Sequence, residues 1–327
     1  YMYAPDYIKE SVKDAKIKDN KLLFTIGVSV RDCTGCSLCT NICPTKAIEM
    51  KRQNLIEQKK FDFLENLKEK EILPKETVKN IGFVRPNFEF SGACAGCGET
   101  PYLRLLSQLF KDNLMVANAT GCSSIYGASV PCVPWKSPWV NSLFEDNAEF
   151  GLGIRLADDF GKEKVRRIMR ENIDRVSNHN RMLFEKYLNN YSKEVSMEVY
   201  DNLRYNEVKE LEALKKYIKE KSVWLVGGDG WAYDIGFGGI DHVLSLKENV
   251  NILVLDTEVY SNTGGQSSKS TRQGAIAKFN STGKRENKKN LIDIALAHKD
   301  VYVGTISLGA NYNHTIKTLV DADKYNG

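Results

Sequence analysis

The 327-residue sequence has no apolar run long enough to cross a membrane. A spanning helix needs about 20 consecutive apolar residues, whereas LLFTIGVSV, among the longest apolar runs, is far shorter. The sequence also lacks a recognisable signal peptide and a large excess of charge, since 46 basic and 42 acidic residues leave a net charge of +4. We therefore expect a cytoplasmic protein with no membrane partner and no nucleic-acid partner.

Internal repeats and low-complexity tracts are also missing, and 42% hydrophobic with 27% charged residues is a globular composition. Apolar residues at helical spacing predict mainly helices over about 141–220. Beyond that region, apolar strands alternate with helices, which predicts an α/β fold with a parallel sheet flanked by helices. The predicted strands are 114–119, 222–228, 251–256 and 301–309, and the predicted helices begin near Thr100 and lie near 234–246, 272–280 and 313–322.

The segment CTGCSLCTNICP places Cys33, Cys36, Cys39 and Cys43 in the spacing C-x2-C-x2-C-x3-C-P of bacterial ferredoxins. Such a run directs three thiolates to one [4Fe-4S] cluster and the fourth to another, and a zinc knuckle is the alternative. A two-cluster ferredoxin needs the run twice, and it occurs once here. We therefore expect this chain to be part of a longer protein whose other run precedes Tyr1.

The segment VWLVGGDGWAYDIGFGG, residues 223–239, places Asp229 in a glycine-rich loop after an apolar strand. It matches neither G-x-G-x-x-G nor the P-loop pattern. A negative charge beside a phosphate-binding loop is understandable if a divalent cation lies between them. The next strand end, LDTEVYSNTGGQ, offers the oxygen ligands of Thr257 and Asn262, and parallel strands end at one sheet edge. The alternative is a glycine-rich turn in which Asp229 caps a helix.

These two segments together resemble a thiamin diphosphate signature. Read with CAGCGETPY, NATGCSSIYGASVP and NSLFEDNAEFGLG, they closely resemble the pyruvate:ferredoxin (flavodoxin) oxidoreductase family. The resemblance covers nearly the whole chain and points to the C-terminal part of a longer enzyme. It implies a partial ferredoxin-like α+β domain over 1–60, a helical connector over 61–85, and a thiamin diphosphate and Mg²⁺ domain over 86–327 with a helical insertion at about 141–220.

The resemblance also implies roles for individual residues. Asp229, Thr257 and Val259, the last through its carbonyl, correspond to the Mg²⁺ ligands. Gly228 and Gly230 flank the aspartate in the cofactor-binding loop. Two further residues correspond to catalytic positions beside the cofactor, namely Asn262 and Glu99.

The second cysteine group, Cys94, Cys97 and Cys122, corresponds to three ligands of a [4Fe-4S] cluster beside the cofactor. No later motif in the sequence matches the family's fourth ligand. Cys132 is close enough in sequence to replace it, and a local interpretation of all four cysteines is a structural zinc site. We interpret Cys132 as a buried free thiol. Trp135 and Trp139 are expected to pack rather than to contact substrate.

The implied activity is oxidative decarboxylation of pyruvate to acetyl-CoA and CO2, with ferredoxin or flavodoxin as the electron acceptor and coenzyme A as the second substrate. The resemblance implies a homodimer and places the pyrimidine-binding domain in N-terminal parts absent from this sequence. We therefore expect residues 1–327 to be inactive alone. Two alternatives are a non-redox thiamin diphosphate enzyme with a structural zinc site and a module for electron transfer only. The ferredoxin run argues against the non-redox enzyme. The predicted cofactor site of Asp229, Thr257 and Asn262 argues against a module for electron transfer only.

Overall fold

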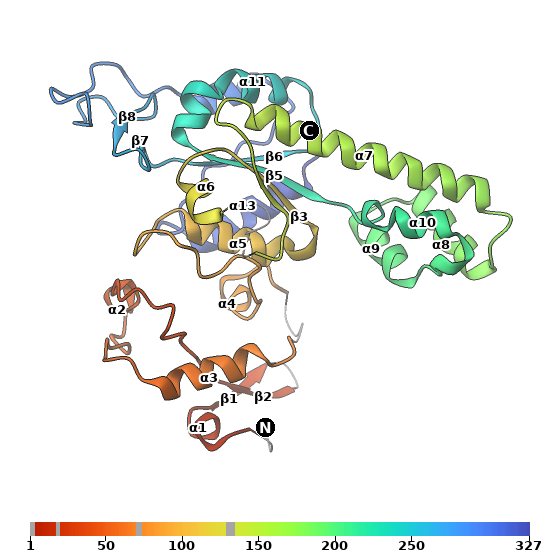
Figure 1. The fold of residues 1–327 in the computed structure, drawn as a ribbon, viewed down its shortest axis with the longest axis horizontal. Helices are drawn as coiled ribbons and strands as arrows, with labels where there is room; N and C mark the ends of the chain where they lie inside the picture. Colours follow the sequence, from red (N-terminus) through yellow and green to blue (C-terminus); the bar gives the residue numbers. More distant parts are fainter. Residues whose placement is uncertain (1–3, 18–19, 70–73, 129–134) are drawn as a thin grey trace. The chain divides into compact units, whose positions relative to one another are not determined.

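The computed structural model describes residues 4–17, 20–69, 74–128 and 135–327. The chain divides into two compact units, each treated by itself below (Figure 1). The first unit contains Tyr1–Leu73 and Cys94–Gly98, and the second contains Pro74–Ala93 and Glu99–Gly327.

The first unit combines a β-hairpin with short helices. Strand β1 pairs antiparallel with strand β2, so that Lys13 lies opposite Phe24. The helix that follows the cysteine run begins after Asn54, whose side chain accepts a hydrogen bond from the Ile56 amide at 2.9 Å, a favourable N-terminal cap. The elements are α1 (Asp6–Lys9), β1 (Lys13–Ile17), β2 (Asn20–Phe24), α2 (Leu38–Ile42) and α3 (Leu55–Glu65).

The second unit is built on a parallel sheet of four strands in the order β4-β3-β5-β6. Three of them were expected, namely β3 (Leu114–Asn118), β5 (Ser222–Gly228) and β6 (Asn251–Leu255). The fourth, β4 (Trp139–Asn141), spans three residues and was not predicted. The predicted α/β fold with a parallel sheet is confirmed.

Helices cover both faces of this sheet, as Figure 1 shows. The side chains of β5 alternate between the faces. Trp224 and Val226 belong to the core formed with α5 (Thr100–Phe110) and α13 (Tyr312–Lys324). Val223 and Leu225 belong to the opposite core, formed with α7 (Asn147–Asn172) and α11 (Phe237–Ser245). A strand buried on both faces needs a continuous apolar run, and this explains the sequence SVWLV.

Helix α7 runs past the sheet and carries a separate helical core (Figure 1). Residues Val165 and Met169 of α7 are fully buried there, against Phe184 and Leu211 of neighbouring helices. Among the residues described, no helix is long and apolar enough to cross a membrane. The elements that follow α7 are α8 (Asn178–Asn189), α9 (Lys193–Asn202), η2 (Tyr205–Glu207), α10 (Lys209–Ala213) and η3 (Lys215–Tyr217), so this region is mainly helical, as expected.

Short elements complete the second unit. Most of them lie in the connections before and after the sheet strands. They are α4 (Val78–Ile81), η1 (Lys111–Asn113), α6 (Cys122–Gly127), the π-helical turn η4 (Gly230–Ile235), β7 (Val259–Tyr260), β8 (Gln266–Ser267) and α12 (Leu291–Ala297).

Two predicted elements are wrong. Residues 272–280 form turns instead of a helix, because Gly274 and Phe279 have positive φ angles of 81° and 65°. Their apolar residues have no core to face, since Ile276 and Phe279 are 77% and 89% exposed. Residues 301–307 are assigned no strand, although partly buried and exposed residues alternate through much of the segment. Alternation reports which side is buried, and it does not by itself establish pairing with a neighbouring strand.

Candidate functional site

A pocket lies at the carboxyl ends of β3, β5 and β6, the sheet edge where α/β proteins commonly bind ligands. It gathers every residue that the sequence predicted for cofactor binding. The lining residues are Glu99, Thr120, Gly121, Cys122, Phe144, Gly228, Asp229, Gly230, Thr257, Val259, Tyr260, Ser261 and Asn262.

Three oxygen atoms that can act as metal ligands lie close together in this pocket. The Thr257 hydroxyl lies 3.1 Å from Asp229 Oδ1 and 3.1 Å from the Val259 carbonyl oxygen, so both are within hydrogen-bond reach. Glu258, between the two ligating candidates, has a φ angle of 63°. This left-handed conformation is uncommon for a residue other than glycine, and it turns the chain so that the Val259 carbonyl faces the Thr257 hydroxyl.

Asp229 is buried, with 1% of its surface exposed. Burial raises the pKa of its carboxyl group, and hydrogen bonds from Ser268 and Thr257 oppose that increase. Ser268 Oγ donates to Asp229 Oδ2 at 2.5 Å, so each carboxylate oxygen has a hydroxyl partner. A buried carboxylate that meets a hydroxyl and a carbonyl oxygen is a ligand set suited to Mg²⁺. The donors therefore fit the predicted cation.

Glu99 lies at the other wall of the pocket, directly before α5. It is 8% exposed, and the Tyr126 hydroxyl donates to its Oε2 at 2.9 Å. Burial raises the pKa of the Glu99 carboxyl, the Tyr126 hydrogen bond opposes this, and the charge of Asp229 raises it further. A carboxyl group whose pKa is raised by burial inside a pocket is a candidate for proton transfer.

The two glycines beside Asp229 have different surroundings. A side chain at Gly230 would meet the ring of Tyr260 at 2.4 Å, whereas at Gly228 the nearest atom would be 3.9 Å away. The Tyr260 hydroxyl is held by Asp234 Oδ2 at 2.9 Å, so the ring is fixed across the loop. Gly230 is therefore needed for close packing at this position. Gly228 leaves open space at the pocket.

The ferredoxin-type run lies in the first unit, where Cys33, Cys36 and Cys39 are exposed thiols and Cys43 is half-buried. A hydrogen bond with Thr45 and another with the Ala47 amide lower the pKa of the Cys43 thiol. Among the residues described, no three His, Cys, Asp or Glu side chains are already arranged around a common metal position. Four thiols are the right ligands for an iron–sulfur cluster. In this structure the described cysteines do not converge on a common point.

The second cysteine group is divided between the units. Cys94 and Cys97 belong to the first unit, in a turn closed by a 3.0 Å hydrogen bond from the Cys97 amide to the Cys94 carbonyl. Cys122 opens α6 in the second unit and lines the pocket. The proposed ligand set of these three cysteines thus stays a prediction, and Cys132 lies outside the described residues.

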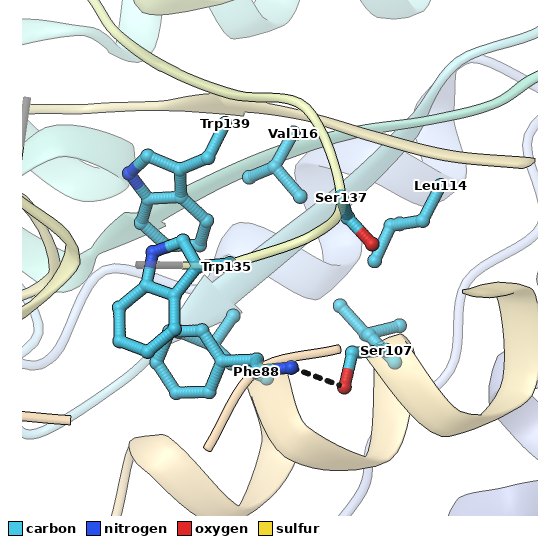
Figure 2. Close-up of a pocket in the computed structure, with 9 residues that line it drawn as sticks. Phe88, Ser107, Leu114, Val116, Trp135, Ser137 and Trp139 are labelled. Atoms are coloured by element: carbon cyan, nitrogen blue, oxygen red, sulfur yellow. Dashed lines mark hydrogen bonds between the residues drawn. The ribbon is translucent and has the colours of Figure 1, made fainter. Parts of the chain in front are cut away.

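A second hollow in this unit belongs to the hydrophobic core. Figure 2 shows the rings of Phe88, Trp135 and Trp139 together along it, and the centroids of Phe88 and Trp135 are 3.9 Å apart. Trp135 and Trp139 are 8% and 4% exposed. Their expected packing role agrees with this burial.

Two residues important to the pocket were missed in the sequence. Ser268 holds Asp229, and Tyr126 holds Glu99. The cluster QSSKST after the predicted loop contained hydroxyl groups that a metal site could use, but its spacing from Asp229 gave no indication of contact. Tyr126 falls inside NATGCSSIYGASVP, where only the cysteine was interpreted.

Two family models match parts of this chain. Residues 211–325 match the family described as thiamine pyrophosphate enzyme, C-terminal TPP binding domain, and residues 27–49 match the 4Fe-4S binding domain. A probable pyruvate-flavodoxin oxidoreductase of Escherichia coli is 46% identical over 97% of the chain and 29% of its own length.

Two further relatives are slightly less similar to the chain. The pyruvate-flavodoxin oxidoreductase of Trichormus variabilis is 43% identical over the full chain and 31% of its own length. The pyruvate:ferredoxin oxidoreductase of Moorella thermoacetica is 43% identical over 94% of the chain and 29% of its own length. The chain thus spans less than a third of the length of these relatives.

Proposed function

The chain belongs to the pyruvate:ferredoxin (flavodoxin) oxidoreductase family, and from that premise we propose that its second unit holds the Mg²⁺-diphosphate end of thiamin diphosphate. The observation that carries the proposal is the meeting of Asp229 Oδ1, Thr257 Oγ1 and the Val259 carbonyl in one pocket. Hydroxyl, carboxylate and carbonyl oxygens are the ligands that Mg²⁺ takes in phosphate sites.

Within this proposal each residue of the pocket has a limited task. Asp229, Thr257 and Val259 bind the cation, and the glycine loop lets the diphosphate approach the backbone. Thiamin diphosphate supplies the electron sink for decarboxylation of a 2-oxoacid when bound. Glu99, whose pKa is raised by burial, is the proposed proton-transfer group, and the Tyr126 hydroxyl donates to its Oε2 and holds the carboxyl in place. Asn262 lines the same pocket and offers an amide to the reacting groups.

The first unit is proposed to hold iron and sulfide through Cys33, Cys36, Cys39 and Cys43. Its match to a 4Fe-4S binding domain over residues 27–49 supports this over a zinc knuckle. Iron–sulfur clusters supply one-electron transfer when bound. The three residues proposed for a further cluster near the cofactor are Cys94, Cys97 and Cys122.

We propose for the whole protein the reaction named for its relatives, oxidation of pyruvate with flavodoxin or ferredoxin as acceptor. Coenzyme A as acetyl acceptor, a homodimer, a cytoplasmic location and partnership with further domains of the same enzyme are parts of this proposal. Matches to both cofactor-binding domains in one chain favour it over a non-redox enzyme and over a module for electron transfer only.

The test is a titration of the full chain with thiamin diphosphate, with and without Mg²⁺, followed by calorimetry and by tryptophan fluorescence. Trp231, fully buried directly after the glycine loop, is positioned to report binding. We expect Mg²⁺-dependent binding that Asp229→Asn weakens by about 100-fold or more.

Asp241→Asn is the matched control. Asp241 lies on the following helix, and its side chain is 49% exposed with His298 as its partner at 2.8 Å. Binding by Asp229→Asn as tight as by the control, or wild-type binding that ignores Mg²⁺, contradicts the proposal.

A further inference from the structure

Lys284 is a buried lysine that is linked to the candidate cation site by hydrogen bonds through Ser268. It is 6% exposed, and its Nζ donates to the carbonyl oxygens of Ser268 at 2.9 Å and Thr271 at 2.7 Å. Among the described residues, no carboxylate lies within ion-pair distance of this ammonium group. Burying a charged group with only neutral partners costs free energy. The burial of this ammonium group therefore needs a structural explanation.

Both acceptors of Lys284 belong to one turn, residues 268–271, called the serine turn below. Three side chains of the serine turn bind the ends of two sheet strands. Ser268 Oγ donates to Asp229 Oδ2 and Ser270 Oγ donates to Asp256 Oδ1, each at 2.5 Å. The Thr271 hydroxyl donates to the Glu258 carbonyl. The serine turn therefore connects the loop after β5 to the loop after β6, which are the two halves of the candidate site.

The backbone of Lys284 is fixed independently of its side chain. Its amide donates to the Ala275 carbonyl at 2.9 Å, and its carbonyl accepts from the Gly274 amide at 2.8 Å. Gly283, with a φ angle of 88°, makes the sharp bend that precedes it. The ammonium group thus reaches the serine turn from a backbone position that is already held.

We propose that Lys284 is a positioning residue for the cation site. It holds the serine turn closed, so that Ser268 occupies Oδ2 of Asp229 and the remaining oxygen, Oδ1, faces Thr257 and the pocket. Hydrogen bonds behind a ligating carboxylate fix its orientation and are commonly needed for tight metal binding. The inference rests on the proposed function, because it assigns Lys284 to the binding of the same Mg²⁺ ion.

The test measures the Mg²⁺ concentration that gives half-maximal binding of thiamin diphosphate to the full chain. Lys284→Met keeps the length of the side chain and removes its donors, and we expect it to raise that concentration by about 10-fold or more. The matched control is Lys278→Met, because Lys278 lies in the same loop and is exposed. Ser268→Ala is expected to give a similar increase.

The double variant Lys284→Met with Ser268→Ala separates positioning from general weakening of the fold. Because Lys284 acts through Ser268, the double variant should need no more Mg²⁺ than Ser268→Ala alone. Additive effects would overturn the inference. If Lys284→Met does not fold by circular dichroism, Lys284→Gln, which keeps an amide donor, should give an intermediate increase, and equality with Lys278→Met would overturn the inference.

The outcomes also separate the inference from the proposed function. Wild-type protein that binds thiamin diphosphate without any Mg²⁺ dependence overturns both. Wild-type protein with the dependence, together with a Lys284→Met variant that behaves like Lys278→Met, overturns only the role of Lys284.

Discussion

Replacing Glu220 with glutamine is expected to destabilise the protein strongly, because Glu220 is the shared partner of two buried cations. Its Oε1 lies 2.9 Å from Arg155 Nη1 and 2.8 Å from Lys162 Nζ, and the Tyr191 hydroxyl donates to Oε2. The Arg155 and Lys162 side chains are 5% and 2% exposed. The substitution leaves these two buried charges of α7 with less compensating negative charge.

The pKa of Glu220 indicates the size of the effect. Burial by itself would raise this pKa, but the charge and hydrogen bonds of Lys162, with those of Tyr191 and Arg155, outweigh it and lower the pKa from 4.5 to about 2. The difference corresponds to about 3 kcal/mol of folding free energy. Removing one partner of a buried ion pair typically costs about 3–5 kcal/mol, which agrees with this estimate.

The assay is urea unfolding of the wild type and of Glu220→Gln at several pH values. Because folding lowers the pKa of Glu220, its stabilisation is complete above about pH 4.5 and decreases as the pH falls toward about 2. The difference between the two proteins should therefore be about 3 kcal/mol at pH 7 and smaller in acid. Glu163→Gln is the control, because Glu163 is 60% exposed beside Arg166 and should contribute less than about 1 kcal/mol. Equal stabilities of the two variants at pH 7 would refute the reasoning.

Three further predictions concern the two units. Gly230→Ala should weaken Mg²⁺-dependent binding of thiamin diphosphate by about 10-fold or more in calorimetry, because its methyl group would displace the Tyr260 ring, whereas Gly228→Ala should bind nearly normally. Protein purified without oxygen should contain iron and acid-labile sulfide in similar amounts, and Cys36→Ser should lower both; zinc without sulfide would contradict the iron–sulfur assignment. Residues 1–327 alone should show no coenzyme A-dependent oxidation of pyruvate, and robust turnover would contradict this expectation.

The sequence was sufficient to predict three strands of the central sheet and several of the residues that line the pocket. Strands β3, β5 and β6 are continuous apolar runs, and a run that is buried on both faces can be recognised without tertiary information. Once the sheet is parallel, the polar residues after β5 and β6 must approach one edge. This topological rule predicts that Asp229 and Thr257 lie near each other, and the Thr257 hydroxyl is 3.1 Å from Asp229 Oδ1.

The sequence was not sufficient where hydrogen bonds between distant segments determine the structure. The serine turn meets Asp229 across an irregular loop that has neither helical nor strand periodicity, so nothing local predicts the contact with Ser268. The short strand β4 was not predicted for another reason, because three residues are too few to show the alternation of a β-strand. The helix predicted near 272–280 is wrong because it has no buried face, since Ile276 and Phe279 are exposed.

The most direct test of the central claim is a crystal structure of the protein grown with thiamin diphosphate and Mn²⁺, using anomalous scattering to locate the metal. We expect one strong peak in the pocket, at about 2.1 Å from Asp229 Oδ1, Thr257 Oγ1 and the Val259 carbonyl oxygen. A peak elsewhere, or thiamin diphosphate bound with no metal touching Asp229, would contradict it.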